Sequence, residues 1–113
     1  MSPHRISEAM KLLSFIIKNP QERYTQENRL TIISLLAEVH RELKLILTEF
    51  KEESPEYKRV YQCMRYLAVV VNQVNDGKTH PTQILPNLRT AKKFLEEALA
   101  RNEAISRMMS KSR

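Results

Sequence analysis

The segment TQENRLTIISLLAEVHRELKLILTEF, residues 25–50, decides the fold. Six of its apolar side chains recur at alternating steps of four and three residues: Ile32, Leu36, Val39, Leu43, Ile46 and Phe50. This spacing keeps side chains on one stripe of an α-helix. Further apolar residues widen the stripe on one flank: Leu30, Ile33, Ala37 and Leu47. Charged residues occupy the opposite face: Glu38, Arg41, Glu42, Glu49 and Lys51. A stripe this wide predicts packing against two or three neighbouring helices instead of a single coiled-coil partner.

Both ends of this helix carry sequence signals. Thr25 is expected to be the N-cap, because its hydroxyl can accept a hydrogen bond from the free amides of the first turn. Glu27 adds a negative charge where the helix dipole favours one. A proline disfavours helical geometry in the residue before it, so the Ser54-Pro55 step should end the helix by about residues 51–53.

Prolines and the single glycine separate three further helical patterns. Ser2-Pro3 and Ser54-Pro55 each pair a capping hydroxyl with a proline suited to the first helical position. Gly77 suits the left-handed residue that often follows a helix, and Pro86 can open the last helix. The apolar periodicity between these signals predicts helices near residues 3–18, 25–51, 55–76 and 86–109.

The run Leu67–Val71, Leu-Ala-Val-Val-Val, is apolar at every position. Its β-branched valines would suit a strand by propensity. The flanking residues keep a helical period on both sides, and no partner strand is visible elsewhere, so we assign the run to a helix. A helical segment that is apolar all round predicts deep burial.

Four amphipathic helices with short connections predict an all-α fold, an antiparallel up-down-up-down four-helix bundle. The alternative is a pair of helical hairpins that completes its core by dimerising. The last helical pattern outlasts the others, so its end should project beyond the bundle. The core is predicted to be led by Ile16, Leu36, Val39, Leu43, Met64, Leu67, Val71, Leu88 and Leu95.

The composition indicates one folded domain. Hydrophobic residues make up 42% of the 113 residues and charged residues 28%, which favours a globular core over disorder. We expect residues 1–110 to form the domain and residues 111–113 to be a disordered basic tail. No apolar run approaches the roughly 18 residues of a membrane span. Polar residues interrupt the N-terminus soon after Met1–Arg5, which argues against a signal peptide and predicts a cytoplasmic protein.

The positive charge is concentrated in the last third of the chain. The formal net charge is +6, and residues 78–113 contain eight basic and three acidic residues. A basic segment can bind nucleic acid, anionic lipid or an acidic protein, but it can also be a solvated helix face. Intervening glutamates dilute any stripe that could follow a phosphate backbone. The candidate binding residues of this segment are Lys92, Lys93, Arg101 and Arg107.

The sequence offers no recognisable catalytic or metal-binding motif. His40 could be the phosphoacceptor of a phosphorelay bundle, but the expected glycine after it is missing, and a histidine beside an apolar stripe is more often packed and hydrogen-bonded. The single cysteine, Cys63, excludes an internal disulfide and suits a buried, inert thiol. No pair with Glu-x-x-His spacing occurs. The sequence therefore predicts a protein with no enzymatic activity, no cofactor and no metal.

Tyrosines and arginines gather on the third predicted helix. Tyr57, Tyr61 and Arg65 are of the residue types enriched at protein interfaces. The same tyrosines would equally suit the rim of a core, with their hydroxyl groups in water. These three residues are the second candidate partner surface.

The first half of the chain carries a family resemblance. A helix is followed by Asn19-Pro20, a few polar residues and Glu27-Asn28, and then by Leu30, Ile33 and Glu42-Leu43-Lys44. This half resembles the small immunity proteins that protect lactic acid bacteria against their own class II bacteriocins of the enterocin and pediocin type. The later segments match that family in size and helical character.

The resemblance implies a basic four-helix bundle without enzymatic activity. Such a protein would act at the inner face of the membrane on the sugar-permease receptor that the bacteriocin attacks, and its C-terminal half would select the bacteriocin. Our functional prediction is accordingly a monomeric or homodimeric bundle that acts by protein–protein interaction. The alternative is an adaptor or chaperone that binds an anionic partner, nucleic acid or a membrane surface, through its basic C-terminal helix.

Overall fold

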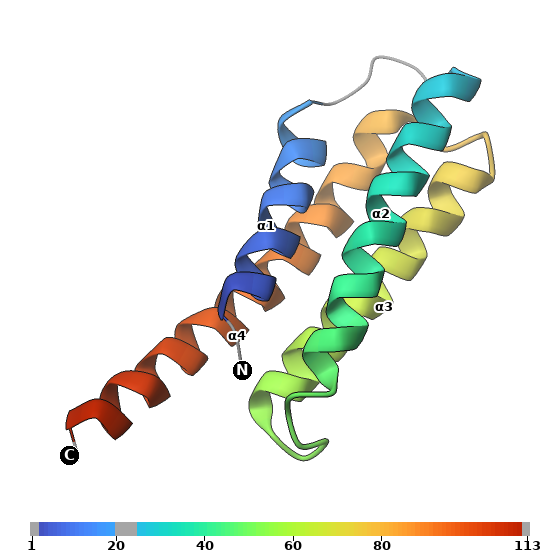
Figure 1. Cartoon of the computed structure of the whole chain (residues 1–113). Coiled ribbons are helices and arrows are strands. Elements are labelled where there is room, and N and C mark those ends of the chain that lie inside the picture. Colours follow the sequence, from blue (N-terminus) through green and yellow to red (C-terminus); the bar gives the residue numbers. More distant parts are fainter. Residues whose placement is uncertain (1–2, 20–24, 112–113) are drawn as a thin grey trace.

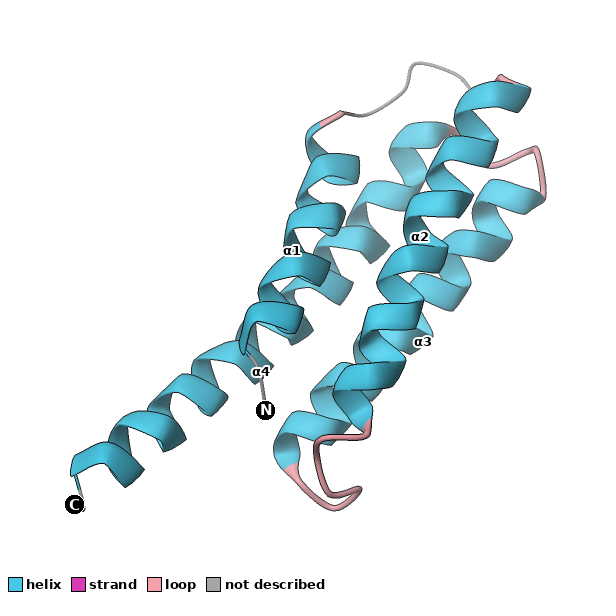
Figure 2. Cartoon of the chain, viewed as in Figure 1, coloured by secondary structure: helices cyan, strands magenta, loops and turns pink. Residues whose placement is uncertain are grey.

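Four long helices make up the part of the chain that the structure describes. The computed structural model describes the backbone of residues 3–19 and 25–111 and the side chains of residues 6–19 and 25–101. The elements are α1 (Pro3–Lys18), α2 (Gln26–Leu47), α3 (Pro55–Asn75), a short 3-10 helix η1 (Pro81–Ile84) and α4 (Leu85–Lys111). Figures 1 and 2 show the helices side by side, with no strand in the described residues.

The bundle closes on itself, which confirms the predicted all-α four-helix architecture. Each long helix packs against its neighbours in sequence, and α1 also packs against α4. Chain direction alternates from one helix to the next, as the short connections predict (Figure 1). A single core therefore lies between all four helices.

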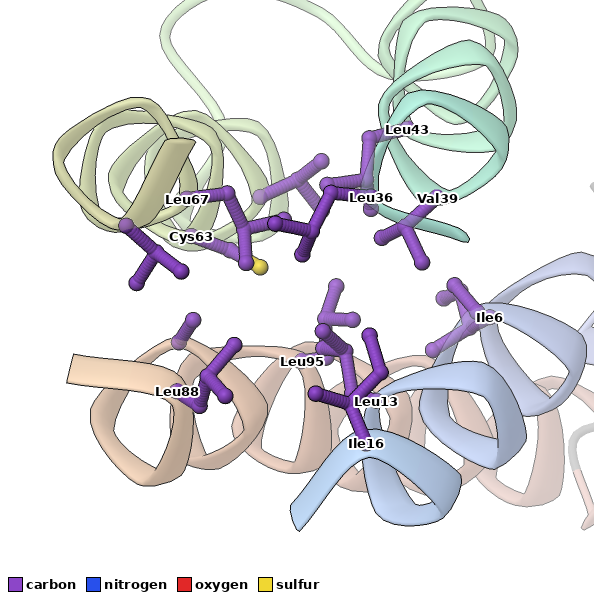
Figure 3. Close-up of a cluster of buried hydrophobic side chains, with 14 of the residues drawn as sticks. Ile6, Leu13, Ile16, Leu36, Val39, Leu43, Cys63, Leu67, Leu88 and Leu95 are labelled. Carbon is purple, nitrogen blue, oxygen red and sulfur yellow. The ribbon is translucent and has the colours of Figure 1, made fainter. Parts of the chain in front are cut away.

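One apolar stripe from each helix fills this core, part of which appears in Figure 3. Predicted core residues Ile16, Leu36, Val39, Leu43, Leu67, Leu88 and Leu95 are all buried, which confirms most of the prediction. The other buried apolar side chains are Ile6, Ala9, Leu13, Ile32, Ile46, Val60, Cys63, Val70, Val74, Ile84, Ala91 and Ala98. The buried side chains named here belong to one continuous cluster.

The buried positions predicted for α3 were wrong by one residue at two places, Met64 and Val71. Met64 and Val71 are only half-buried and pack against the edge of the core. Cys63 and Val70 point inward instead, and both are fully buried. The buried stripe runs through positions 60, 63, 67, 70 and 74, and residues 64 and 71 each lie one position past it, about 100° further around the helix.

The apolar run in α3 is not buried all round, so the prediction of deep burial there was also wrong. Val69 is 46% exposed, although Val70 beside it has no exposed surface. A helix in a four-helix bundle has one side toward solvent, and an apolar residue that falls on that side stays exposed. The same holds for Leu30 on α2, which the sequence pattern had assigned to the flank of the buried stripe and which is 58% exposed.

Helix α2 ends earlier than predicted, at Leu47 instead of near residues 51–53. The chain leaves the helix through tight turns in which the Glu49 and Phe50 amides donate to the carbonyls of Ile46 and Leu47. The Thr48 hydroxyl also donates to the carbonyl of Leu45 at 2.6 Å. This early end bends the chain so that Phe50 packs against the core.

The predicted helix caps are confirmed at the described ends. The Thr25 hydroxyl accepts from the Asn28 amide at 3.1 Å, and the Asn28 side chain accepts from the Thr25 amide at 2.8 Å. Ser54 caps α3 by accepting from the Tyr57 amide at 3.2 Å. Gly77, after α3, has φ +70°, a left-handed backbone that other residues adopt at a cost. Ser2 lies outside the described residues.

The connection from α3 to η1 is organised by Asp76. Its carboxylate accepts from the Thr79 hydroxyl at 2.7 Å and from the amides of Thr79 and Lys78 at 2.9 and 2.8 Å. These hydrogen bonds, that of the Thr79 hydroxyl most of all, hold the pKa of Asp76 below its ordinary value. The charged carboxylate thus fixes the turn that returns the chain along α3.

Helix α4 runs on beyond the other helices, as its sequence pattern predicts (Figure 1). Arg101 of α4 pairs with Glu56 in the first turn of α3, so the residues after Arg101 extend past the start of α3. The molecule measures 55 × 24 × 19 Å as a result. Lys111, which the sequence analysis assigned to a disordered tail, is the last residue of α4. Residues 112 and 113 lie outside the described part.

Replacing Leu43 by Ala is expected to lower the free energy of unfolding by about 2–5 kcal/mol, because it removes a fully buried side chain and leaves a cavity. Leu45→Ala is the matched control on the same helix, since Leu45 is 42% exposed. It should cost at most about 0.5 kcal/mol. Urea denaturation followed by circular dichroism measures both values, and equal losses would contradict the assignment of the core.

Candidate interaction surface

Four side chains at steps of four residues form a strip along the outer face of α3, the first half-buried and the other three exposed. We call Tyr57, Tyr61, Arg65 and Val69 the α3 strip. The buried side of the helix is used by Val60, Leu67 and the residues in phase with them, which turns the strip toward solvent. Tyr61 is 48% exposed and Val69 is 46% exposed. The strip therefore contains the predicted residues and adds Val69, which sequence reasoning had assigned to the core.

The two tyrosines of the strip lie against each other. Their ring centroids are 6.5 Å apart and the ring planes differ by 8°. The backbone amide of Tyr57 donates to the Ser54 hydroxyl that caps α3, which holds the Tyr57 backbone in place. Stacking restricts both side chains before any partner arrives, so binding would cost less side-chain entropy than it would for free rings.

A shallow hollow lies beside the C-terminal half of the strip. Its walls are Gln62, Arg65, Tyr66 and Val69, and its volume is about 220 Å³. Tyr66 is held from behind by Phe94 of α4, at a centroid distance of 5.8 Å. The hollow thus combines an exposed guanidinium with apolar surface on a rigid helix.

The structure does not bring the predicted basic residues of α4 together. Lys92 is half-buried toward α1 and pairs with Glu96 at 3.6 Å. Lys93 is exposed. Arg101 is held by Glu56, and the side chain of Arg107 lies outside the described residues. Glutamates thus form ion pairs with two of these three basic residues, Lys92 and Arg101. The three described basic residues therefore form no continuous basic stripe.

Sequence reasoning missed the pairing of Glu56 with Arg101. Glu56 was expected only to favour the start of α3, but it is 5% exposed, and the Arg101 Nε atom lies 2.7 Å from its Oε1 atom. That oxygen makes no hydrogen bond in the described structure, so the contact is a charge pair without good donor alignment. The available signal was its position four residues before Val60, in phase with the buried stripe.

Cys63 is not a candidate nucleophile. The thiol is fully buried, and this burial raises its pKa to about 12. A thiol with that pKa is protonated at neutral pH, and the thiolate is the reactive form. The structure agrees with the inert role expected from the sequence.

The two histidines whose side chains the structure describes, His40 and His80, do not form a chemical centre. His40 is exposed on α2, not packed as the sequence analysis favoured. His80 caps η1, because its Nδ1 atom accepts from the Thr82 amide at 3.2 Å. Within residues 6–19 and 25–101, no three His, Cys, Asp or Glu side chains gather to hold a metal ion. Nor does any helix searched there have the length and apolar character needed to cross a bilayer.

Comparisons with known proteins give no relative to argue from. No family model, curated protein or solved structure matches the chain. We therefore infer the function from the residues themselves and from the sequence resemblance of the first half.

Arg101→Gln is expected to destabilise the protein by about 1–3 kcal/mol, because the buried Glu56 carboxylate would lose its counter-charge. Arg89→Gln removes the same charge from an exposed position on the same helix and should change stability by no more than about 0.5 kcal/mol. Chemical denaturation compares the two variants. If both lose the same amount, the pair has no structural role.

The Cys63 thiol is expected to stay unmodified by a thiol-specific reagent at pH 8 in the native protein. Full reaction should appear once denaturant unfolds the chain, because both burial and the raised pKa are then removed. Absorbance of the released chromophore measures the reaction. Rapid labelling under native conditions would show that the core opens at Cys63.

Proposed function

We propose that this protein is a non-enzymatic binding module that recognises a protein partner through the α3 strip. The observation that carries the proposal is the alignment of two stacked tyrosines, an arginine and an exposed valine on one rigid helix. Tyrosine and arginine are over-represented among the residues that dominate binding energy at protein interfaces. Rigid aromatic side chains also add contact area at a small entropic cost.

The basic residues of α4 support the alternative less well. An anionic partner would have to compete with Glu56 for Arg101 and with Glu96 for Lys92. Near physiological salt, screening over about 8 Å leaves scattered single charges weak. Binding of nucleic acid or an anionic membrane through α4 would therefore be non-specific and steeply dependent on salt.

The resemblance of the first half to bacteriocin immunity proteins gives this proposal a specific form. In that form, the partner is the sugar-permease receptor at the inner face of the membrane, in the state that the bacteriocin has attacked. The protein would protect by occupying a surface of that complex and would turn over no substrate. A bacteriocin precursor encoded next to this protein would support the form directly.

A capture experiment with matched variants tests the binding surface. The double variant Tyr61→Asp, Arg65→Glu should capture at least about tenfold less partner from the native cell than the wild-type protein does. A loss of about 1.4 kcal/mol in binding free energy is enough for a tenfold weaker affinity. The control variant Arg89→Glu, Lys93→Glu places new negative charge on α4 and should bind like the wild type. Loss in the α4 variant alone would favour the anionic alternative.

A resistance assay tests the immunity form separately. Expression of the wild-type chain in a bacteriocin-sensitive strain should raise the bacteriocin concentration needed to stop growth, and the Tyr61→Asp, Arg65→Glu variant should not. Circular dichroism must show that the variant is folded. If the strain that expresses the wild-type chain stays sensitive to every class II bacteriocin tested, the immunity form of the proposal is wrong. The binding surface on α3 is then tested by the capture experiment alone.

A further inference from the structure

A second exposed face, across α1 and α2, is not used by the proposed function. We define it by three residues of each helix: Lys11, Phe15 and Lys18 on α1, and Glu27, Leu30 and Glu38 on α2. Phe15 is 56% exposed and Leu30 is 58% exposed, the highest values among the large apolar side chains that the structure describes. The two helices lie side by side in Figure 1. Two large apolar side chains on one face, away from the α3 strip, call for an explanation of their own.

This face is also hollowed along its centre. A hollow of about 350 Å³ lies between Phe15 of α1 and Glu27 and Leu35 of α2. A second hollow of about 400 Å³ shares Glu27 and Leu35 with it and extends to Leu30 and Glu38. The first hollow can therefore receive apolar side chains between the two helices, and the second can receive them on the surface of α2.

The charges of this face separate by helix. Lys11 and Lys18, which line one hollow with Lys92 of α4, outnumber Glu8 on the α1 side, and Glu27 and Glu38 make the α2 side negative. Lys11 pairs with Glu8 at 3.3 Å but keeps 73% of its side chain exposed, so it remains available to a partner. Arg41 and Lys44 of α2 lie further along the helix than Glu38.

Because α1 and α2 are antiparallel, lysines of α1 lie at similar positions along the bundle axis to glutamates of α2. The end of α1 and the start of α2 line the same hollow, so Lys18 lies at the level of Glu27. Lys11 lies about two turns away in the direction of Glu38. A two-fold axis parallel to the helices would lay α1 of one copy over α2 of the other at the same height. Lys18 would then meet Glu27 of the second copy, and Lys11 would approach Glu38 of that copy.

We propose that the face across α1 and α2 binds a second copy of this chain, with the positive side of each copy against the negative side of the other. Such a face is self-complementary under two-fold symmetry, which is the requirement for an isologous dimer. Phe15 and Leu30 of both copies lie at the centre, where apolar contacts exclude water. The α3 strip belongs to a different helix and stays free in this dimer.

Anionic partners fit this face less well. A membrane of anionic lipid or a nucleic acid would be attracted by Lys11 and Lys18 but repelled by Glu27 and Glu38. A purely acidic or purely basic peptide would match only half of the face. Only a partner with the same separation of charge satisfies both sides, and a second copy of the chain has it.

The size of the face predicts a weak dimer. Helix α1 has 16 residues, so two adjacent helices present about 24 by 20 Å, or about 500 Å² from each copy. A total near 1,000 Å² lies at the lower end of specific interfaces. We therefore expect dissociation constants of about 10–100 μM, weakened further by salt that screens the four charge pairs.

Sedimentation of the full chain at rising concentration tests this proposal. The mean mass should rise from the monomer toward twice that value between about 10 μM and 1 mM protein, with a shift to higher concentration in 1 M salt. Lys11→Glu with Lys18→Glu should abolish the dimer, and so should Glu27→Lys with Glu38→Lys. Phe15→Ala should weaken it at least about tenfold. The control Lys58→Glu with Lys93→Glu lies outside the face and should sediment like the wild type.

Two further samples identify the partner as a second copy in the stated orientation. An equimolar mixture of the two charge-reversed variants should form a heterodimer, because each then offers the sign that the other needs. The chain with all four charges reversed should again form a homodimer. A wild-type chain that stays monomeric at 1 mM, or variants that dimerise unchanged, would overturn the proposal, and the capture experiment on the α3 strip would still stand by itself.

Discussion

The structure depends on the burial of one apolar stripe from each helix in a single shared core. Every buried side chain that the structure describes is apolar except Glu56, and the single cysteine excludes an internal disulfide. Stability must then come mainly from removing apolar surface from water and from close packing. This constraint fixes the rotation of each helix about its axis, and with it the side chains that remain outside. The α3 strip and the face across α1 and α2 are consequences of that rotation.

Polar contacts between α3 and α4 set the height at which these helices meet. Arg59 pairs with Glu97 at 3.2 Å, and the Asn87 side chain donates to that of Gln73 at 3.2 Å. The Glu56 pair with Arg101 continues the same antiparallel alignment toward the free end of α4. Exposed pairs of this kind contribute little energy, but a buried carboxylate penalises any alignment that leaves it unpaired. The projecting end of α4 follows from this register.

Most of the fold could be predicted because it depends on local signals. Thr25 and Ser54 cap helices, Gly77 ends one, and α1 has its predicted bounds because short-range rules govern those positions. The phase of α3 could not be settled by periodicity, because Leu67–Val71 is apolar at every position and several stripes fit it equally well. The early end of α2 places Phe50 against the core, a tertiary contact that the pattern along the chain does not reveal.

The candidate surface divides in the same way. Helical spacing groups Tyr57, Tyr61 and Arg65 along one helix, but the phase of α3 was open, so only the structure shows that Tyr61 and Arg65 are exposed. Helical spacing alone brings Glu96 near Lys92, but the loss of Arg101 from the basic patch depends on Glu56 of α3, which only the folded structure brings near. Net charge along the chain could not reveal this pairing, because it counts charges without their neighbours.

The central proposal is that the outer side of α3 binds a protein partner, while the interior contributes stability. The most direct measurement is site-specific photo-crosslinking in the native cell, with a photoreactive phenylalanine analogue at position 61 in one strain and at position 89 in another. The account predicts one discrete protein adduct from position 61 and none from position 89. Adducts from position 89 alone, or none from position 61, would contradict it.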